Sequence, residues 1–309
     1  MSSRIDTHRA TIDRAAIGDA AKTAASNPLS RFLKGRENRA KVIPTILMLV
    51  IGLSMTFPFL WMISASMKFE NAVFEYPIRW IPEEWRAVEN YSEVWSNKYN
   101  FALSYWNSIK VTVLATALQV FVSALGAYGF SRIKFRGRDK LFLLYLATVM
   151  IPPQVIIVPK FMQLRWMGIY DTHFAIIVML AFSVYGVFLL RQYMVTIPTS
   201  LNESAKIDGA GHLRIFLQII LPITKPALAT LAILKFVWTW NDYQTPLVFL
   251  SSRELYTIQL ALKRFSSEYG TYYSLVMAAA VSAIIPLFIV FILGQKYITS
   301  GITAGSVKG

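Results

Sequence analysis

Long apolar runs separated by short polar stretches dominate the hydropathy pattern of this 309-residue chain. Six runs lack Asp and Glu and are about 20 residues long, the length an α-helix needs to cross the hydrocarbon of a bilayer. They predict six membrane-spanning helices: Val42–Ser66, Ile109–Phe130, Leu141–Pro159, Phe174–Leu190, Ile219–Trp240 and Leu275–Gly294. We therefore expect an all-α integral membrane protein, in which a spanning domain (42–299) lies between an N-terminal tail (1–41) and a C-terminal tail (300–309).

Two of the predicted spans have unusual features. The fourth is short, and we expect it to extend into residues 191–194. The third contains Pro152 and Pro153, which remove helical hydrogen bonds and are tolerated in a span where neighbouring helices or water satisfy the freed carbonyl groups. Kinked helices around a transport pathway and an ordinary packing irregularity both fit this pattern.

The composition agrees with a membrane protein, since 55% of the residues are hydrophobic and only 16% are charged. The chain has no cysteine, which excludes disulfides and thiolate metal sites. Its net charge of +14 is informative through its distribution, because Lys and Arg accumulate in cytoplasmic loops. An N-terminus inside the cell gives the inner segments about twice as many Lys and Arg as the outer ones. Both termini and the loop 199–222 are then cytoplasmic.

That loop, residues 199–222, is a polar island between two apolar runs, and it is the most informative stretch of the chain. Ser200 and Glu203 have the S-x-x-E spacing of a capping box, in which each side chain bonds the backbone amide of the other residue. Gly209 and Gly211 permit a sharp turn after this helix. The pattern predicts two short helices joined by a glycine turn, which suits a surface knob that docks on a partner.

The same residues resemble a known motif. Glu203-Ser204-Ala205, then Gly209, then Ile219-x-Leu221-Pro222 resembles the EAA loop of ABC-importer permease subunits, E-A-A-x3-G-x9-I-x-L-P, with Ser204 in place of the first alanine. The resemblance implies a type I importer permease fold and a coupling helix that sits in a cleft of a cytoplasmic ATPase. The implied coupling residues are Glu203, Ser204, Ala205, Asp208, Gly209, Ala210, Gly211, Leu221 and Pro222.

The resemblance extends from about residue 42 to residue 309 and is closest to the maltose-type carbohydrate importers. The pattern Trp238-x-Trp240-Asn241-Asp242-Tyr243 is similar to that of sugar permeases. The C-terminal tail resembles the maltose-type tail that inserts between two ATPases, which implies contacts from Gly305, Ser306, Val307, Lys308 and Gly309. The third predicted outer loop, residues 241–274, corresponds to one that in this family reaches toward the solute-binding protein. The resemblance implies contacts from Arg264, Ser266, Ser267, Glu268 and Tyr269, and a solvated connector is the alternative.

The resemblance also implies a set of partners. These are a second permease subunit forming a heterodimer, two ATPase subunits, an extracytoplasmic solute-binding protein and the lipid of a prokaryotic inner membrane, with no nucleic acid. ATP and Mg²⁺ would be bound by the ATPases, so that no cofactor or metal is expected in this chain.

Lys235 lies deep in the fifth predicted span, where a charge costs about 2.5–3.5 kcal/mol on insertion scales. Asp242 follows two helical turns later on the same face, which allows a water-bridged pair. One hypothesis is that the transport path is bordered by Lys235, Trp238, Asn241, Asp242, Tyr243 and Tyr185, the aromatic residues stacking on sugar faces. A structural lysine at a subunit interface is the equal alternative.

The sequence argues against catalysis by this chain. Its three histidines fall in separate segments, no metal-binding or phosphate-binding motif appears, and the carboxylates are scattered, so no catalytic residues are expected. An ion-coupled secondary transporter or a channel is the alternative function, but such proteins usually carry carboxylates within their spans. The predicted spans hold none, which favours a permease driven by a separate ATPase.

Overall fold

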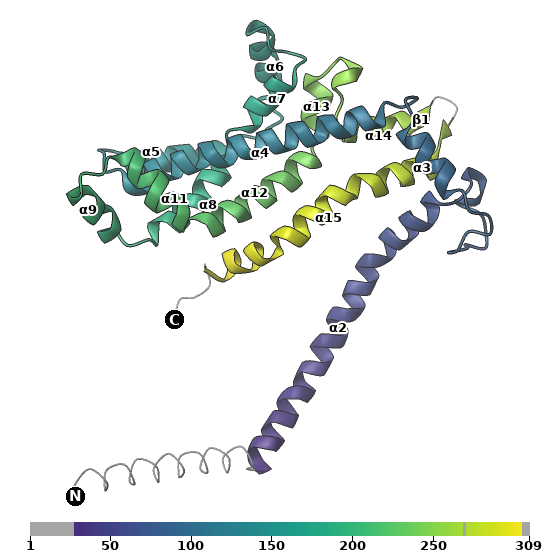
Figure 1. The fold of residues 1–309 in the computed structure, drawn as a ribbon, viewed down its shortest axis with the longest axis horizontal. Helices are drawn as coiled ribbons and strands as arrows, with labels where there is room; N and C mark the ends of the chain where they lie inside the picture. The colour runs from purple at the N-terminus through teal and green to yellow at the C-terminus, as the bar shows by residue number, and fades with distance from the viewer. Residues whose placement is uncertain (1–27, 268–269, 305–309) are drawn as a thin grey trace, which may run out of the picture. The chain divides into compact units, whose positions relative to one another are not determined.

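The computed structural model describes residues 28–267 and 270–304 (Figure 1). The chain divides into two units, Met1–Trp61 and Met62–Gly309. The described elements are helices apart from two strands, β1 (Ser266–Ser267) and β2 (Gly270–Thr271), which pair antiparallel with Ser266 opposite Thr271. The prediction of an all-α chain is confirmed.

The described helices are, in chain order, α2 (Pro28–Ser66), η1 (Glu70–Ala72), α3 (Ala87–Trp95), α4 (Phe101–Arg132), α5 (Arg138–Ala147), η2 (Thr148–Met150), α6 (Ile157–Trp166), α7 (His173–Leu180), α8 (Val184–Val195), α9 (Ser200–Ile207), α10 (His212–Ile215), the π-helical turn η3 (Phe216–Ile220), α11 (Leu221–Ile223), α12 (Lys225–Trp240), α13 (Gln244–Phe249), η4 (Arg253–Leu255), α14 (Ile258–Leu262), η5 (Lys263–Phe265) and α15 (Tyr273–Ala304).

The first unit contains most of helix α2, whose segment Lys41–Ser66 is long and apolar enough to cross a membrane. This segment covers the first predicted span. Its large apolar side chains are exposed, and Leu53 and Met55 each keep about two thirds of their surface. Such a surface is stable only against lipid or apolar partner helices.

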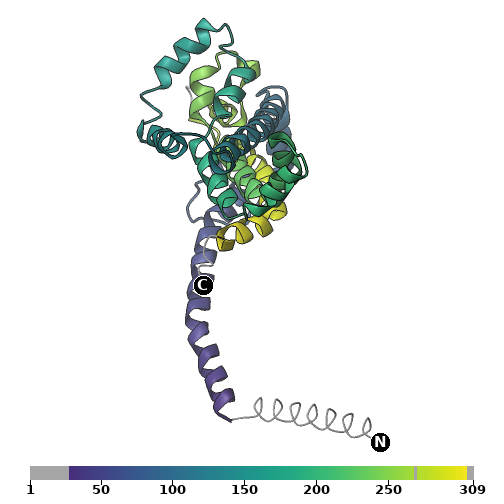
Figure 2. The same ribbon diagram turned by 90° about the vertical axis from the view of Figure 1, so that its left-hand side faces the viewer.

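The second unit is built around α4, a 32-residue helix about 48 Å long at 1.5 Å per residue. Helices α8 and α12 pack along α4, and α15 packs along α12. These four helices lie lengthwise in Figure 1 and are seen nearly end-on in Figure 2. Buried clusters form near both ends of α4, one around Tyr128 and Phe216 and one around Phe101 and Trp240.

The third predicted span, Leu141–Pro159, is not a continuous helix in the structure. Helix α5 ends at Ala147, the short turn η2 follows, and α6 begins only at Ile157. The reason is local, because Pro152 and Pro153 lack amide hydrogens and push the residues before them out of the helical conformation. Helix α6 stands away from the bundle in both views (Figures 1 and 2).

The fourth and fifth predicted spans are bent pairs of helices. Helices α7 and α8 meet at 41°, and the second of them extends to Val195, as the short fourth span led us to expect. The segment His212–Ile223 meets α12 at 77°, so the fifth predicted span, Ile219–Trp240, is helical but bent before Lys225 and not one straight helix. Pro222 and Pro226 flank this bend, and each removes a backbone donor.

Among the described residues, three helices are long and apolar enough to span a membrane, or up to five if each bent pair counts as one span. The second and sixth predicted spans lie inside two of these helices, α4 and α15.

Helices α4 and α8 approach each other closely at Gly186. A Cβ atom at this position would lie 2.5 Å from Ser123 Oγ and 3.0 Å from Gln119 Nε2. Ser123 and Gln119 are almost fully buried, so they have little room to move aside. Glycine is therefore required here for the two helices to pack, as small residues often are between spanning helices.

Candidate functional site

Helix α9 forms from the motif region, but the predicted capping box does not. Thr199 already has helical backbone angles, and its carbonyl accepts hydrogen bonds from the amides of Asn202 and Glu203 at 2.9 and 3.1 Å. Ser200 is therefore inside the helix instead of capping it, and the side chains of Ser200 and Glu203 make no cap. The S-x-x-E pattern therefore correctly predicted that a helix starts here, but it placed that start one residue too late.

The glycine turn is confirmed. Gly209 has φ of 80°, the left-handed conformation that favours glycine. Its amide donates to Lys206 O at 3.0 Å, and the amide of Ala210 donates to Ala205 O at 2.9 Å. This pair of bonds is the Schellman motif, which satisfies the last carbonyl groups of a helix and sets the direction of the chain after it.

The predicted coupling residues divide between two environments. Ala205 is buried in the cluster that contains Tyr128 and Phe216, and Ala210 and Leu221 pack against that cluster. The others are exposed: Glu203, Ser204, Asp208, Gly209, Gly211 and Pro222. Leu201 and Ile207 of α9 are exposed as well, with 87% of the Ile207 surface accessible. One side of α9 thus rests on the protein, while the apolar side chains of Leu201 and Ile207 remain exposed.

The last turn of α4 holds both flanks of α9, which the sequence did not suggest. The Tyr128 hydroxyl donates to His212 O at 3.1 Å and lies 3.2 Å from His212 Nδ1, just beyond α9. The Arg132 guanidinium donates to Met194 O and to Ile197 O, just before α9. The chain just before α9 and the chain just after it are therefore both hydrogen-bonded to the last turn of α4.

A second feature that the sequence analysis missed is a row of small polar residues along the buried face of α4. Its members are Ser104, Ser108, Thr112, Thr116, Gln119 and Ser123. Thr116 Oγ1, Gln119 Nε2 and Ser123 Oγ are buried without a hydrogen-bond partner among the described residues. The sequence did contain a signal for this row, because polar residues recur every three to four positions in an otherwise apolar helix.

The predicted path residues lie on α8, on α12 and in the turn that follows α12. The rings of Tyr185 and Trp238 are 5.5 Å apart. Lys235 is only 7% exposed and makes no direct hydrogen bond or ion pair with the described residues, but the charge of Asp242 lies near enough to act on it. Asp242 instead accepts a hydrogen bond from the Thr245 amide, and the Asn241 side chain donates to Val237 O. Tyr243 is half-exposed.

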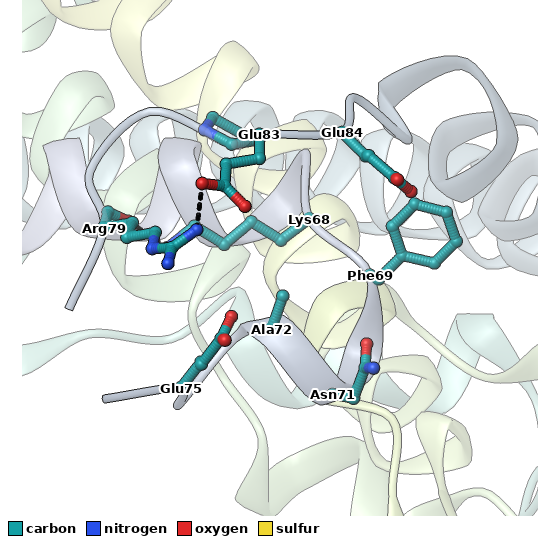
Figure 3. Close-up of a pocket in the computed structure, with 9 residues that line it drawn as sticks. Lys68, Phe69, Asn71, Ala72, Glu75, Arg79, Glu83 and Glu84 are labelled. Carbon is teal, nitrogen blue, oxygen red and sulfur yellow. Dashed lines mark hydrogen bonds and ion pairs between the residues drawn. The ribbon is translucent and has the colours of Figure 1, made fainter. Parts of the chain in front are cut away.

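At the opposite end of α4, residues 67–100 form a folded cap. The Glu70 carboxylate accepts from the amides of Tyr273 and Ser274, both at 2.8 Å, and so caps the start of α15. A pocket of about 380 Å³ beside it is lined by Lys68 and by the acidic residues Glu75, Glu83 and Glu84 (Figure 3). Burial lowers the pKa of Lys68, and the charge of Glu75 partly opposes that shift.

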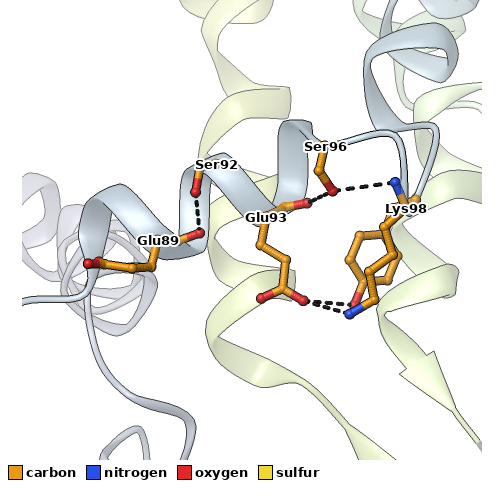
Figure 4. A network of polar contacts seen from close by, with 6 residues as sticks. Glu89, Ser92, Glu93, Ser96 and Lys98 are labelled. Carbon is orange, nitrogen blue, oxygen red and sulfur yellow. Dashed lines mark hydrogen bonds and ion pairs between the residues drawn. The ribbon is translucent and has the colours of Figure 1, made fainter.

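Helix α3 in this cap carries a small polar network (Figure 4). Lys98 Nζ donates to the Glu93 carboxylate at 2.7 Å, which raises the pKa of Lys98. Nearby, a hollow of about 700 Å³ is lined by the basic residues Lys98, Arg253 and Lys263 among others. The two ends of α4 therefore carry different surfaces, an α9 knob at one and a folded cap with basic and acidic hollows at the other.

Several predicted contact residues lie outside what the structure shows. Glu268, Tyr269 and the tail from Gly305 to Gly309 are outside the described residues. The backbones of Ser266 and Ser267 form β1, and Arg264 lies in η5. Within the described residues, no group of three or more His, Asp or Glu side chains is arranged to hold a metal ion.

Helix α9, fastened at both flanks, thus lies at one end of a bundle of apolar helices (Figure 1). The family model for the binding-protein-dependent transport system inner membrane component matches residues 26–304. The chain belongs to this family, and it is an ABC importer permease of the inner membrane.

Named relatives and a solved structure support the same family assignment. The chain is 31% identical over 281 residues to the melibiose/raffinose/stachyose import permease protein MelC of Bacillus subtilis (strain 168), covering 90% of this chain and 100% of that one. It is 30% identical over 270 residues to the arabinooligosaccharides transport system permease protein AraQ of the same organism, covering 87% and 96%. Its fold is similar, with a TM-score of 0.75 and 28% identity, to a chain of a bacterial ABC transporter involved in the import of the acidic polysaccharide alginate, covering 83% and 95%.

Proposed function

We propose that this chain is the permease subunit of an ATP-driven importer of a carbohydrate, with the sugar moving inward by alternating access. The observation that carries the proposal is helix α9, which is fastened at both flanks and leaves the apolar side chains of Leu201 and Ile207 exposed. The carbohydrate class is supported by the oligosaccharide permeases and the alginate importer to which the chain is similar.

The proposed complex contains this chain, a second permease subunit, two ATPases that hydrolyse ATP, and an external solute-binding protein. Both tails (1–41 and 300–309) and α9 are cytoplasmic in this arrangement, with six spans in the domain 42–299. The exposed apolar surface of α2 suits a partner helix or lipid. The basic hollow lined by Lys98, Arg253 and Lys263 suits the docking of the binding protein near the predicted contact residues.

The mechanism follows from the connections of α9. Closure of the ATPase pair pushes on Glu203–Gly211, and the Schellman turn keeps the two short helices at a fixed angle. Because Arg132 and Tyr128 fasten both flanks of α9, the push is delivered to α4 as well as to α8 and α12. Because these helices are rigid and packed together, a local displacement of α9 changes the side of the membrane to which the transport pathway is open.

The sugar path is proposed to pass the cluster of Lys235, Tyr185 and Trp238. A buried lysine that forms no direct hydrogen bond or ion pair with the described residues, with only the charge of Asp242 nearby, suits a wet cavity or a polar ligand. The paired rings of Tyr185 and Trp238 provide flat apolar surfaces of the kind on which sugar faces stack.

Co-purification tests the proposal. The tagged chain is expressed with its companion permease and ATPase and compared with Glu203→Lys, a charge reversal on α9, and with Glu89→Lys, the same change on α3 at the other end of α4. We expect wild type and Glu89→Lys to retain the ATPase and sugar-stimulated hydrolysis, and Glu203→Lys to lose one or both. A wild-type chain that purifies alone and moves solute in vesicles without ATP would instead establish a secondary transporter.

A further inference from the structure

A basic pocket of about 570 Å³ lies where the end of α4, the turn after it, α8 and α9 meet. Five of the side chains that line it are cationic: Arg132, Lys134, Arg138, Arg191 and Lys206. Glu203 is the one carboxylate in the lining. Nothing in the coupling of α9 to α4 requires so large an excess of positive charge, so the pocket needs a separate explanation.

The positive charges of this basic pocket are only partly neutralised. Arg138 and Arg191 share the exposed carboxylate of Asp139, at 3.2 and 3.3 Å. Lys134 and Lys206 form no ion pair with any described residue. The Nε atom of Arg132 is buried and has no hydrogen-bond partner in the described part of the chain. Like charges gathered around a partly closed space repel one another, and an anion placed between them offsets that repulsion.

An apolar strip leads away from the basic pocket along α8. Phe188, Arg191 and Val195 are spaced three and four residues apart, so they lie on one face of the helix. Phe188 is 37% exposed and Val195, which lines the pocket, is 54% exposed. Cationic groups at the end of a helix, continuous with an exposed apolar face, match a phosphate joined to an acyl chain better than they match a small free anion.

We propose that the basic pocket binds the phosphate headgroup of an acidic phospholipid, with an acyl chain lying along Phe188 and Val195. Basic pockets between spanning helices at the cytoplasmic surface recognise such headgroups. The placement of the pocket at that surface rests on the proposed function. Since Asn202, Glu203 and Lys206 of α9 also line the pocket, the bound lipid supports the base of the coupling helix.

The test measures lipid retention by the assembled complex without ATP, so its outcome is separate from that of the transport assay. The complex is equilibrated with vesicles of phosphatidylcholine and phosphatidylglycerol, washed in detergent, and its bound lipids are counted by native mass spectrometry. The pocket variant is Lys134→Gln with Arg138→Gln. The matched control is Arg136→Gln with Lys140→Gln, which removes the same charge from the same segment at positions that do not line the pocket.

We expect the wild type and the control to retain phosphatidylglycerol and the pocket variant to retain several-fold less. The charge-conserving change Lys134→Arg with Arg138→Lys should restore retention, which separates loss of the site from misfolding. Equal loss in the pocket and control variants would show unspecific surface attraction and overturn the proposal. Binding of inorganic phosphate with no retained lipid would assign the pocket to a soluble anion. Loss of the ATPase with unchanged lipid would assign its cations to a partner's carboxylates.

Discussion

At the scale of single residues, Gly209 and Gly211 show how closely a sequence motif can anticipate geometry. Gly209 has φ of 80°, whereas Gly211 has φ of −73° with extended ψ. An added Cβ at either position would meet no atom within 4 Å. The difference between the two is therefore one of backbone conformation alone, and only Gly209 has to be glycine for the turn after α9.

Replacing each glycine by valine should separate these two roles. Gly209→Val forces a side chain into the left-handed region, which costs at least about 1–2 kcal/mol and opens the Schellman turn. Gly211→Val suits the extended backbone and should leave the turn intact. In Gly209→Val we expect faster hydrogen exchange at the backbone amides next to Gly211, above all at the Ala210 amide. We also expect a lower ratio of sugar transported to ATP hydrolysed in this variant. Equal exchange in the two variants would contradict this account.

The capping box is the residue-scale prediction that was wrong. Ser200 and Glu203 have the required spacing, but Thr199 is already helical and its carbonyl takes the first intrahelical bonds. The sequence did not resolve this shift because Thr and Ser are both good capping residues.

At the scale of elements, α4 connects the two ends of the molecule's second unit. Its first turn belongs to the cluster around Phe101 and Trp240, and its last turn carries Tyr128 and Arg132. The sequence predicted the apolar stretch Ile109–Phe130 of this helix, which includes Tyr128, but not its first two turns or Arg132, because residues that lie outside the hydrocarbon need not be apolar. The first turns link α4 to the cap, and the last turn, with Tyr128 and Arg132, links it to the flanks of α9.

Removing the Tyr128 hydroxyl should weaken the link between α4 and the exit of α9. In Tyr128→Phe the ring keeps its packing against Phe216, 5.2 Å away, while the bond to His212 O is lost at a cost of about 0.5–1.5 kcal/mol. We expect faster hydrogen exchange at residues 212–215 and a lower transport-to-hydrolysis ratio. Tyr145→Phe is the control, since that hydroxyl makes no hydrogen bond to a described residue. The account fails if both variants have the same transport-to-hydrolysis ratio.

At the scale of the whole molecule, a buried charge in a largely apolar bundle marks a place where stability and function compete. Lys235 is 7% exposed on α12 and forms no direct ion pair with the described residues, and burial of such a cation is unfavourable even with the charge of Asp242 nearby. A methionine of similar length would fill the same space without that cost. Retention of lysine is explained if it contacts the transported solute or the water around it, as we propose.

The variant Lys235→Met, measured in the reconstituted complex, tests whether Lys235 contacts the transported solute or the water around it. We expect the variant to assemble normally, to be at least as resistant to thermal unfolding as wild type, and to transport several-fold more slowly. Lys225→Met, an exposed lysine at the start of the same helix, serves as the control and should transport at the wild-type rate. Normal transport in Lys235→Met with loss of the companion permease would instead show a structural lysine at the subunit interface.

By itself, the sequence determined where most of the apolar helical segments lie, although not the breaks within the third, fourth and fifth predicted spans, and where the α9 turn lies. Both depend on local properties, namely the apolar content of each run and the freedom of Gly209 to adopt positive φ. Only the tertiary structure decided the contacts between distant segments. Tyr128 meets His212 across 84 residues of chain, and Arg132 meets Ile197 across 65, because helices α4 and α8 pack side by side. Such contacts depend on the packing of helices around one another, which a single sequence does not display.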